Sequence, residues 1–261
     1  MNHPRRALAL VPALGLALVA LLASARPAQD AKEQLRAIDQ ELQQQFARVQ
    51  AASRAGDGSI GAVLGEFRDK TLPGFAKRLA EIAHAHPGTD DALDAWMKVF
   101  DLVPMGYDGA IAHEALEVVT RDHLSSERLV DLANLLEYAP EGDEEAALHA
   151  LRTMAEGSPH RAVKAAALFS LGCVLASERD DGDPRLEEAK VALRKLADYA
   201  DLKHPDGRSY TDAAHAILFA LENLVVGKPC PEFDALDAEG AGFKLSDYRG
   251  KVVLIDFWGF W

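Results

Sequence analysis

The stretch TDDALDAWMKVF (Thr89–Phe100) decides the fold class of this chain. Its apolar side chains Leu93, Trp96, Met97 and Phe100 recur at intervals of three and four residues. Since an α-helix turns once in about 3.6 residues, this spacing places them on one helical face. The threonine and the two aspartates before them are typical of a helix start. The stretch therefore predicts an amphipathic helix that buries one side.

The same helical spacing recurs from about residue 31 to residue 225, and breaks rich in glycine and proline separate the runs. The last run, Ile217, Leu218, Leu221 and Leu224, is expected to form one buried face. Counting every second helix, the predicted starts are about 33 to 36 residues apart, close to the period of helix-turn-helix repeats. The predicted fold is thus mainly α, a solenoid-like domain of antiparallel helical hairpins over residues 31–225. We expect helix starts near residues 90, 110, 126, 143 and 160.

One hairpin carries a more specific pattern, with Leu171-Gly172 on its first helix and Ala189 at the start of its second. These residues stand where a tetratricopeptide repeat has its Leu-Gly pair and its second helix, so the segment resembles that repeat. Generic antiparallel helices would give a similar pattern, and both interpretations stay open. In either case a single hairpin cannot bury its apolar face, so neighbouring hairpins must stack.

The N-terminus has the three parts of a secretory signal peptide. A basic start, MNHPRR, precedes about 17 apolar residues and a small-residue site at Ala23 and Ala25. Pro12 and Gly15 argue against a permanent membrane helix, as does a length below the roughly 20 residues that a span needs. We predict a signal peptide over residues 1–25, and an exported protein of the periplasm or cell envelope that meets the membrane only if this segment stays uncleaved.

Composition narrows the class of partner. The chain has 261 residues, is 49% hydrophobic and carries a formal net charge of −13. Nucleic acid and anionic lipid would be repelled by this charge, so we expect neither as a main partner. His84 and His86 are interpreted as part of a surface turn, and Asp180, Asp181 and Asp183 as a solvated turn, so no metal and no cofactor is expected.

Cys173 and Cys230 are the two cysteines of the sequence. In an exported protein such a pair can form one disulfide bond. Cys173 lies in the apolar helical run AAALFSLGCVLAS, which favours a buried thiol that packs as a small hydrophobic side chain.

The sequence pattern changes at residue 226. GKPCPEF (227–233) contains two prolines and a glycine, which a helix does not tolerate. FKLSDYRGK (243–251) and VVLIDFWGFW (252–261) follow as short β-like runs with turns. In order and spacing these blocks resemble the opening of TlpA-type thioredoxin-like thiol-disulfide oxidoreductases, within the redoxin (AhpC/TSA) superfamily. The resemblance implies that residues 226–261 are the N-terminal β-hairpin and the first central strand, 251–257, of an incomplete α/β thioredoxin-like domain.

The resemblance also implies roles for individual residues. Asp256 matches the aspartate that lies beneath the redox pair and relays protons with a raised pKa. Trp258 and Trp261 match the aromatic residues that bracket the active-site loop. The nucleophile of the Cys-x-x-Cys motif is expected immediately after Trp261, whereas Cys230 stands where the family usually has alanine and is not expected to replace it.

The last residues, KVVLIDFWGFW, are apolar and strand-like, so we expect the sequence to be truncated with respect to its own fold. Three causes stay open: a fragment or natural short form, a nonsense mutation or annotation error, and a UGA codon that encodes selenocysteine. We favour selenocysteine, because it replaces a nucleophilic cysteine at the position where the sequence stops.

Two functions from different classes follow from these observations. The first is an exported thiol-disulfide oxidoreductase that acts on protein disulfides or dithiols with a redox partner protein; the 261-residue chain itself would be inactive because it lacks the redox pair. The second is a non-enzymatic helical interaction module with a vestigial redox tail.

Overall fold

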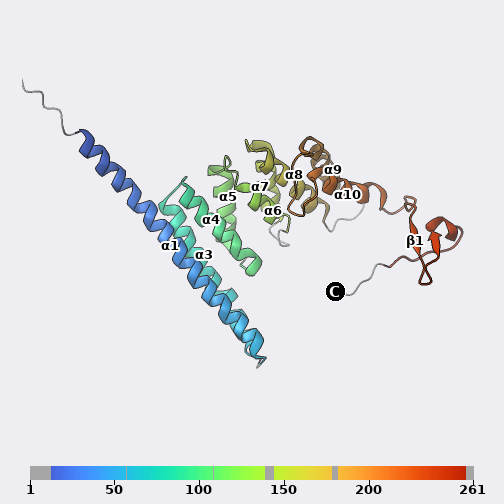
Figure 1. Cartoon of the computed structure of the whole chain (residues 1–261), viewed down its shortest axis with the longest axis horizontal. Helices are drawn as coiled ribbons and strands as arrows, with labels where there is room; N and C mark the ends of the chain where they lie inside the picture. The colour runs from blue at the N-terminus through green and yellow to red at the C-terminus, as the bar shows by residue number, and fades with distance from the viewer. Residues whose placement is uncertain (1–12, 57, 108, 139–143, 178–181, 257–261) are drawn as a thin grey trace, which may run out of the picture. The chain divides into compact units, whose positions relative to one another are not determined.

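The predicted helical spacing forms helices in the computed structural model, which describes residues 13–56, 58–107, 109–138, 144–177 and 182–256. The chain divides into two compact units, Met1–Lys164 and Ala165–Trp261, and the boundary falls within one helix. The mainly helical architecture is confirmed (Figure 1). The first unit contains α1 (Ala13–Ala55), α2 (Ile60–Glu66), the π-helical turn η1 (Phe67–Thr71), α3 (Leu72–Ala85), α4 (Asp90–Leu102), the 3-10 turn η2 (Val103–Met105), α5 (Ala110–Asp122), α6 (Leu129–Leu136) and α7 (Glu144–Gly157).

Helix α8 (Arg161–Ala176) spans the boundary between the units. The second unit continues with α9 (Arg185–Arg194), the 3-10 turn η3 (Lys195–Tyr199), α10 (Tyr210–Asn223), β1 (Asp234–Leu236), β2 (Gly242–Lys244) and the 3-10 turn η4 (Leu245–Tyr248). The predicted helix starts near 90, 110, 143 and 160 agree with the structure to within one residue. The start expected at 126 is three residues early, because residues 126–128 form a turn in which the Arg128 backbone N–H donates to Ser126 Oγ at 3.3 Å.

The hairpin of α3 and α4 forms the centre of the first unit. Gly88 has a φ of 71°, a left-handed conformation that glycine adopts without strain, and it reverses the chain between the two helices. Thr89 Oγ1 then accepts a hydrogen bond from the Ala92 backbone N–H at 3.2 Å and caps α4. The predicted face of α4 is buried, with Trp96 only 1% exposed; Met97, at its edge, is half-buried. The facing residues of α3, Phe75, Leu79 and Ile82, are buried as well.

Helix α1 lies along this hairpin (Figure 1). Ala31, Leu35 and Ile38 are buried in the first unit. Glu41 accepts hydrogen bonds from Arg78 of α3 at 2.5 and 3.0 Å, and Asp39 accepts from Lys98 of α4 at 2.6 and 2.8 Å. Apolar burial and charge pairing thus attach α1 to both helices.

The N-terminal part of α1 overlaps the predicted signal peptide. Residues 1–12 lie outside the described part of the chain, and residues 13–25 belong to α1. From residue 13 onward, within the described ranges, no helix has both the length and the apolar character needed to cross a membrane. The signal peptide stays a prediction.

The helices of the second unit pack closely at one glycine. A Cβ atom on Gly172 of α8 would lie 2.5 Å from Cγ of Leu193 on α9. An aromatic cluster of Phe169, His204 and Tyr210, with ring centroids 4.5 to 5.8 Å apart, joins α8 to the start of α10. The tetratricopeptide-like interpretation stays a prediction, and Gly172 is the residue that allows α8 and α9 to approach.

Two sequence predictions for this unit are wrong in part. Leu218 of α10 is buried, but Leu224 is 59% exposed, because the helix ends at Asn223 and the chain then turns away from the helical packing. Cys173 is half-buried rather than buried. Both cysteines lie in the described part of the chain, and they are not joined by a disulfide bond.

Candidate functional site

The segment predicted to carry the chemistry begins with a two-stranded antiparallel hairpin. Strands β1 and β2 pair Asp234 with Lys244, Ala235 with Phe243, and Leu236 with Gly242. The predicted β-hairpin is therefore present. The register brings the Lys244 ammonium to 3.3 Å from the Asp234 carboxylate, an exposed pair that contributes little to stability.

Asp237 holds the hairpin turn together. Its Oδ1 accepts hydrogen bonds from the backbone N–H groups of Glu239 at 3.0 Å and Ala241 at 2.7 Å. Gly240 has a φ of 83°, which closes the turn without the strain that a side chain would bring. All of these contacts lie within residues 237–241, so the turn is defined by local interactions.

The residues LSDY that follow the hairpin form η4 and fold back on the segment before it. The Ser246 backbone N–H donates to Glu232 Oε1 at 3.0 Å, and the Leu245 N–H donates to the Phe233 carbonyl at 3.2 Å. The pKa of the Glu232 carboxyl is held below its usual range. The main cause is a hydrogen bond from the Ser246 side chain, and hydrogen bonds from the backbone of Ser246 and Phe233 add to it. Glu232 therefore remains an anionic acceptor that ties η4 to the start of the hairpin.

The chain leaves this small fold at Arg249-Gly250-Lys251. Gly250 has a φ of 83°, and the Lys251 backbone N–H donates to the Tyr248 carbonyl at 3.0 Å. The Tyr248 ring meets Phe243 edge to face at 5.9 Å, and Lys251 Nζ lies 5.5 Å from the Tyr248 ring centroid. These contacts connect the start of the apolar run at Lys251 to strand β2.

The strand predicted over residues 251–257 is not formed in its described part. Residues Val252 to Asp256 have no regular secondary structure, and the side chains of Val252 and Leu254 are 102% and 93% exposed. A strand needs hydrogen bonds to a neighbouring strand, and none of the described residues pairs with this run. The sequence prediction took this strand from the family resemblance, and it described the domain as incomplete.

Among the predicted site residues, only Asp256 is described by the structure. Its side chain is exposed, whereas the prediction placed it beneath a redox pair. Trp258 and Trp261 lie outside the described residues. The proton-relay role of Asp256 therefore stays a prediction. It requires other residues to bury the carboxylate beneath the redox pair.

Cys230 lies beside the same small fold. It lines a shallow depression with Glu232, Tyr248, Arg249 and other residues of the segment, and its side chain is exposed. Sequence reasoning missed Glu232 and Ser246 as the pair that organises this segment, although both stand within the blocks that carry the resemblance.

The metal sites considered from the sequence have other surroundings. His84 lies in the last turn of α3 with its side chain exposed; its Nε2 is 2.8 Å from Glu114 Oε1 and its ring meets Trp96 edge to face, while His86 follows as the C-cap of the helix. Asp183 pairs with Arg185 at the start of α9, while Asp180 and Asp181 lie outside the described residues. Within the described ranges, no group of three or more His, Cys, Asp and Glu side chains is arranged to hold a metal ion.

Comparison with known proteins gives short similarities. The thiol-disulfide oxidoreductase ResA of Bacillus thuringiensis subsp. konkukian (strain 97-27) is 42% identical over 40 residues, which cover 15% of this chain and 23% of that protein. ResA of Geobacillus thermodenitrificans (strain NG80-2) is 47% identical over 38 residues, 15% of this chain and 22% of that protein. No family model and no solved structure matches the chain. The chain spans less than a quarter of the length of these curated relatives, and the similarities support a thioredoxin-like oxidoreductase relationship.

Proposed function

We propose that this chain is the N-terminal part of an exported thiol-disulfide oxidoreductase. In this proposal, residues 1–25 are the signal peptide, residues 31–225 form a helical domain that selects or holds partner proteins, and residue 226 begins a thioredoxin-like domain. The observation that carries it is the similarity to ResA over 38 to 40 residues, a length close to that of the segment 226–261.

The local fold of this segment supports the proposal. The hairpin, η4 and the Gly250 turn form from contacts within residues 232–251, and they lead directly into the apolar run that begins at Lys251. A run with apolar side chains on both faces is typical of a central parallel strand covered on both sides. We therefore propose that residues 251–257 become such a strand when the rest of the domain is present.

The proposed chemistry is thiol-disulfide exchange. A thiolate or selenolate immediately after Trp261 attacks one sulfur of a substrate disulfide, so that a mixed disulfide forms and the other substrate sulfur leaves as a thiolate. The second cysteine of the motif then attacks the mixed disulfide, releasing the reduced substrate and leaving the pair oxidised. Asp256 takes up and returns the proton of this second thiol, and a dithiol redox partner reduces the pair again.

Sequencing the genomic DNA downstream of the Trp261 codon tests whether the proposed redox pair follows this residue. We expect an in-frame UGA followed by codons for Gly-Pro-Cys, a helix-strand pattern over about a hundred codons and a recoding stem-loop. The same frame without a recoding element would identify a nonsense allele. A stop with no thioredoxin-like sequence behind it would contradict the oxidoreductase proposal.

Insulin reduction tests the activity. The 261-residue chain and its Cys230→Ser variant are both expected to remain at background, because neither contains the redox pair. A protein extended through the downstream frame, with cysteine at the recoded position, is expected to be active, and its Asp256→Asn variant to be slower with an altered pH profile. Activity of the 261-residue chain above that of Cys230→Ser would show that Cys230 is itself a nucleophile.

The second candidate is a non-enzymatic interaction module. It is favoured by the predominance of helices in the described part of the chain. An extended protein that stays inactive towards insulin while the helical part still binds a partner would support it.

A further inference from the structure

The side chains of the apolar run after Lys251 alternate in exposure. Val252 and Leu254 are 102% and 93% exposed, whereas Val253 and Ile255 are 43% and 40% exposed. In an extended chain successive side chains point to opposite sides, which gives a period of two. Although the run has no strand partner among the described residues, one of its sides is turned toward neighbouring residues and the other toward solvent.

The side of the run that contains Val253 meets the shallow depression beside Cys230. Glu232, Ser246 and Tyr248 line this depression together with Cys230 and Val253. Its wall therefore comes from the residues before the hairpin and from η4, and Val253 of the run closes it. The more exposed neighbours of Val253 in the run are not part of the lining.

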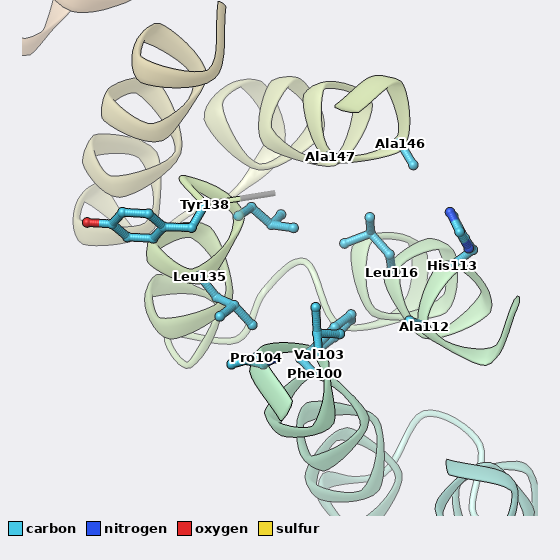
Figure 2. Close-up of a pocket in the computed structure, with 11 residues that line it drawn as sticks. Phe100, Val103, Pro104, Ala112, His113, Leu116, Leu135, Tyr138, Ala146 and Ala147 are labelled. Carbon is cyan, nitrogen blue, oxygen red and sulfur yellow. The ribbon is translucent and has the colours of Figure 1, made fainter. Parts of the chain in front are cut away.

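The depression is built by residues close in sequence. All of its lining residues lie within residues 229–253. Figure 2 shows a contrasting pocket of the first unit, lined by Phe100 of α4, Leu116 of α5 and Leu135 of α6, among others. That pocket depends on several helices that meet in space, whereas the depression depends on local contacts that the 261-residue chain contains.

Glu232 holds the wall of the depression in place. Its Oε1 accepts the hydrogen bond from the Ser246 backbone N–H at 3.0 Å, and a hydrogen bond to a carboxylate is stronger than one between neutral groups. The Leu245 N–H donates to the Phe233 carbonyl at 3.2 Å beside it. If the carboxylate is removed, η4 keeps only this second backbone attachment to the start of the hairpin among the contacts described here.

We propose that Glu232 is a positioning residue for the redox site, because it fixes η4 and thereby decides which side of the run faces η4. Val253 and Ile255 face η4, and Asp256 lies on the opposite side by the alternation of an extended chain. The inference rests on the proposed function, in which Asp256 serves the redox pair. The redox pair then lies on the side of the run that η4 leaves open.

Disulfide trapping in the full 261-residue chain tests which side faces η4. Cys173→Ala leaves Cys230 as the remaining native thiol, and a second thiol is added by Val253→Cys or, as the matched control, by Leu254→Cys. A disulfide needs Cβ atoms about 3.5–4.5 Å apart, so the direction of the side chain controls its formation. In a glutathione buffer, well below micromolar protein concentration, we expect the monomer with Val253→Cys to close its disulfide about tenfold faster. Equal rates, or faster closure with Leu254→Cys, would overturn the proposal.

Variants of Glu232 test the positioning role in the Val253→Cys background. Glu232→Ala removes the acceptor of the Ser246 N–H and should slow trapping to nearly the rate of Leu254→Cys. Glu232→Gln removes the same charge but keeps an acceptor oxygen, so it should retain most of the rate. Glu239→Ala, which removes an exposed carboxylate from the hairpin turn, should change the rate by less than about twofold. Unchanged trapping in Glu232→Ala, or equal loss in Glu232→Ala and Glu232→Gln, would overturn the role of its acceptor oxygen.

The protein extended through the downstream frame separates this inference from the proposed function. If that protein does not reduce insulin while the preference for Val253→Cys holds, the oxidoreductase proposal fails and the assignment of the two sides stands. If it reduces insulin while trapping shows no preference, the oxidoreductase proposal stands and the positioning role of Glu232 fails. Glu232→Ala in an active extended protein should slow insulin reduction, and Glu232→Gln should restore most of the rate.

Discussion

His123 is a buried titratable side chain at the C-terminal end of α5. The residue is 7% exposed, and its Nε2 atom has no hydrogen-bond partner among the described residues. Burial lowers the pKa of the imidazole; Asp122 and Asp90 oppose this effect, while Arg128 adds to it. The folded protein therefore holds His123 in the neutral form more strongly than the unfolded chain does.

The stability of the protein is expected to fall in mild acid because of His123. An unfolded histidine titrates near pH 6.5, so below that value the unfolded state binds a proton that the folded state excludes. The free energy of unfolding should decrease from about pH 7 down to the lowered pKa of the folded state and then level off. His123→Gln should reduce the loss of Tm between pH 7.5 and pH 5.5, measured by circular dichroism.

The exposed residue His149 supplies the control for this prediction. His149→Gln should keep the pH dependence of the original protein. If His123→Gln and the original protein lose the same Tm over this range, burial of His123 does not contribute to acid sensitivity.

At the scale of elements, the contact of α8 with α9 depends on the absence of one side chain. The two helices approach so closely at Gly172 that an added Cβ would lie 2.5 Å from Leu193 Cγ and 2.6 Å from its Cδ2. Leu193 is 1% exposed and has little room to move. The helices would therefore separate, or Leu193 would leave its rotamer.

Gly172→Ala is expected to destabilise the protein by about 1–3 kcal/mol through this overpacking, measured as a shift in the urea midpoint. Gly74→Ala is the matched control, because Gly74 lies in α3 with no atom within 4 Å of an added Cβ. That change should instead stabilise by roughly 0.5–1 kcal/mol, the helical advantage of alanine. Gly172→Ala should cost less in a Leu193→Ala background, and equal costs in both backgrounds would rule out the steric explanation.

At the scale of the whole molecule, the run Val252 to Ile255 is an exposed apolar segment without strand partners among the described residues. Such a segment can pair with a copy of itself through its backbone and bury its side chains. We expect the 261-residue chain to self-associate at micromolar concentration in sedimentation velocity.

Val252→Lys combined with Leu254→Lys should shift this distribution toward monomer, because like charges would face each other in the paired segments. Val191→Lys combined with Leu224→Lys removes exposed apolar groups from helical regions and should leave self-association largely unchanged. A similar response of both double variants would assign the association to general surface hydrophobicity.

Local sequence determined the helices and the hairpin of this protein. The spacing in Thr89–Phe100 predicted α4, its cap and its buried face, because helical hydrogen bonds and caps connect residues close in sequence. The turn residues Asp237 and Gly240 likewise define a hairpin that closes on itself.

Tertiary structure decided the features that need segments distant in sequence. The apolar pattern of the run from Lys251 is strand-like, but a strand exists only with a neighbour, so Asp256 is exposed rather than placed beneath a redox pair. The close approach of Gly172 to Leu193 also arises from helices that meet in space. Periodicity specifies which face of a helix is apolar. Which side chains that face contacts depends on how the helices pack against one another.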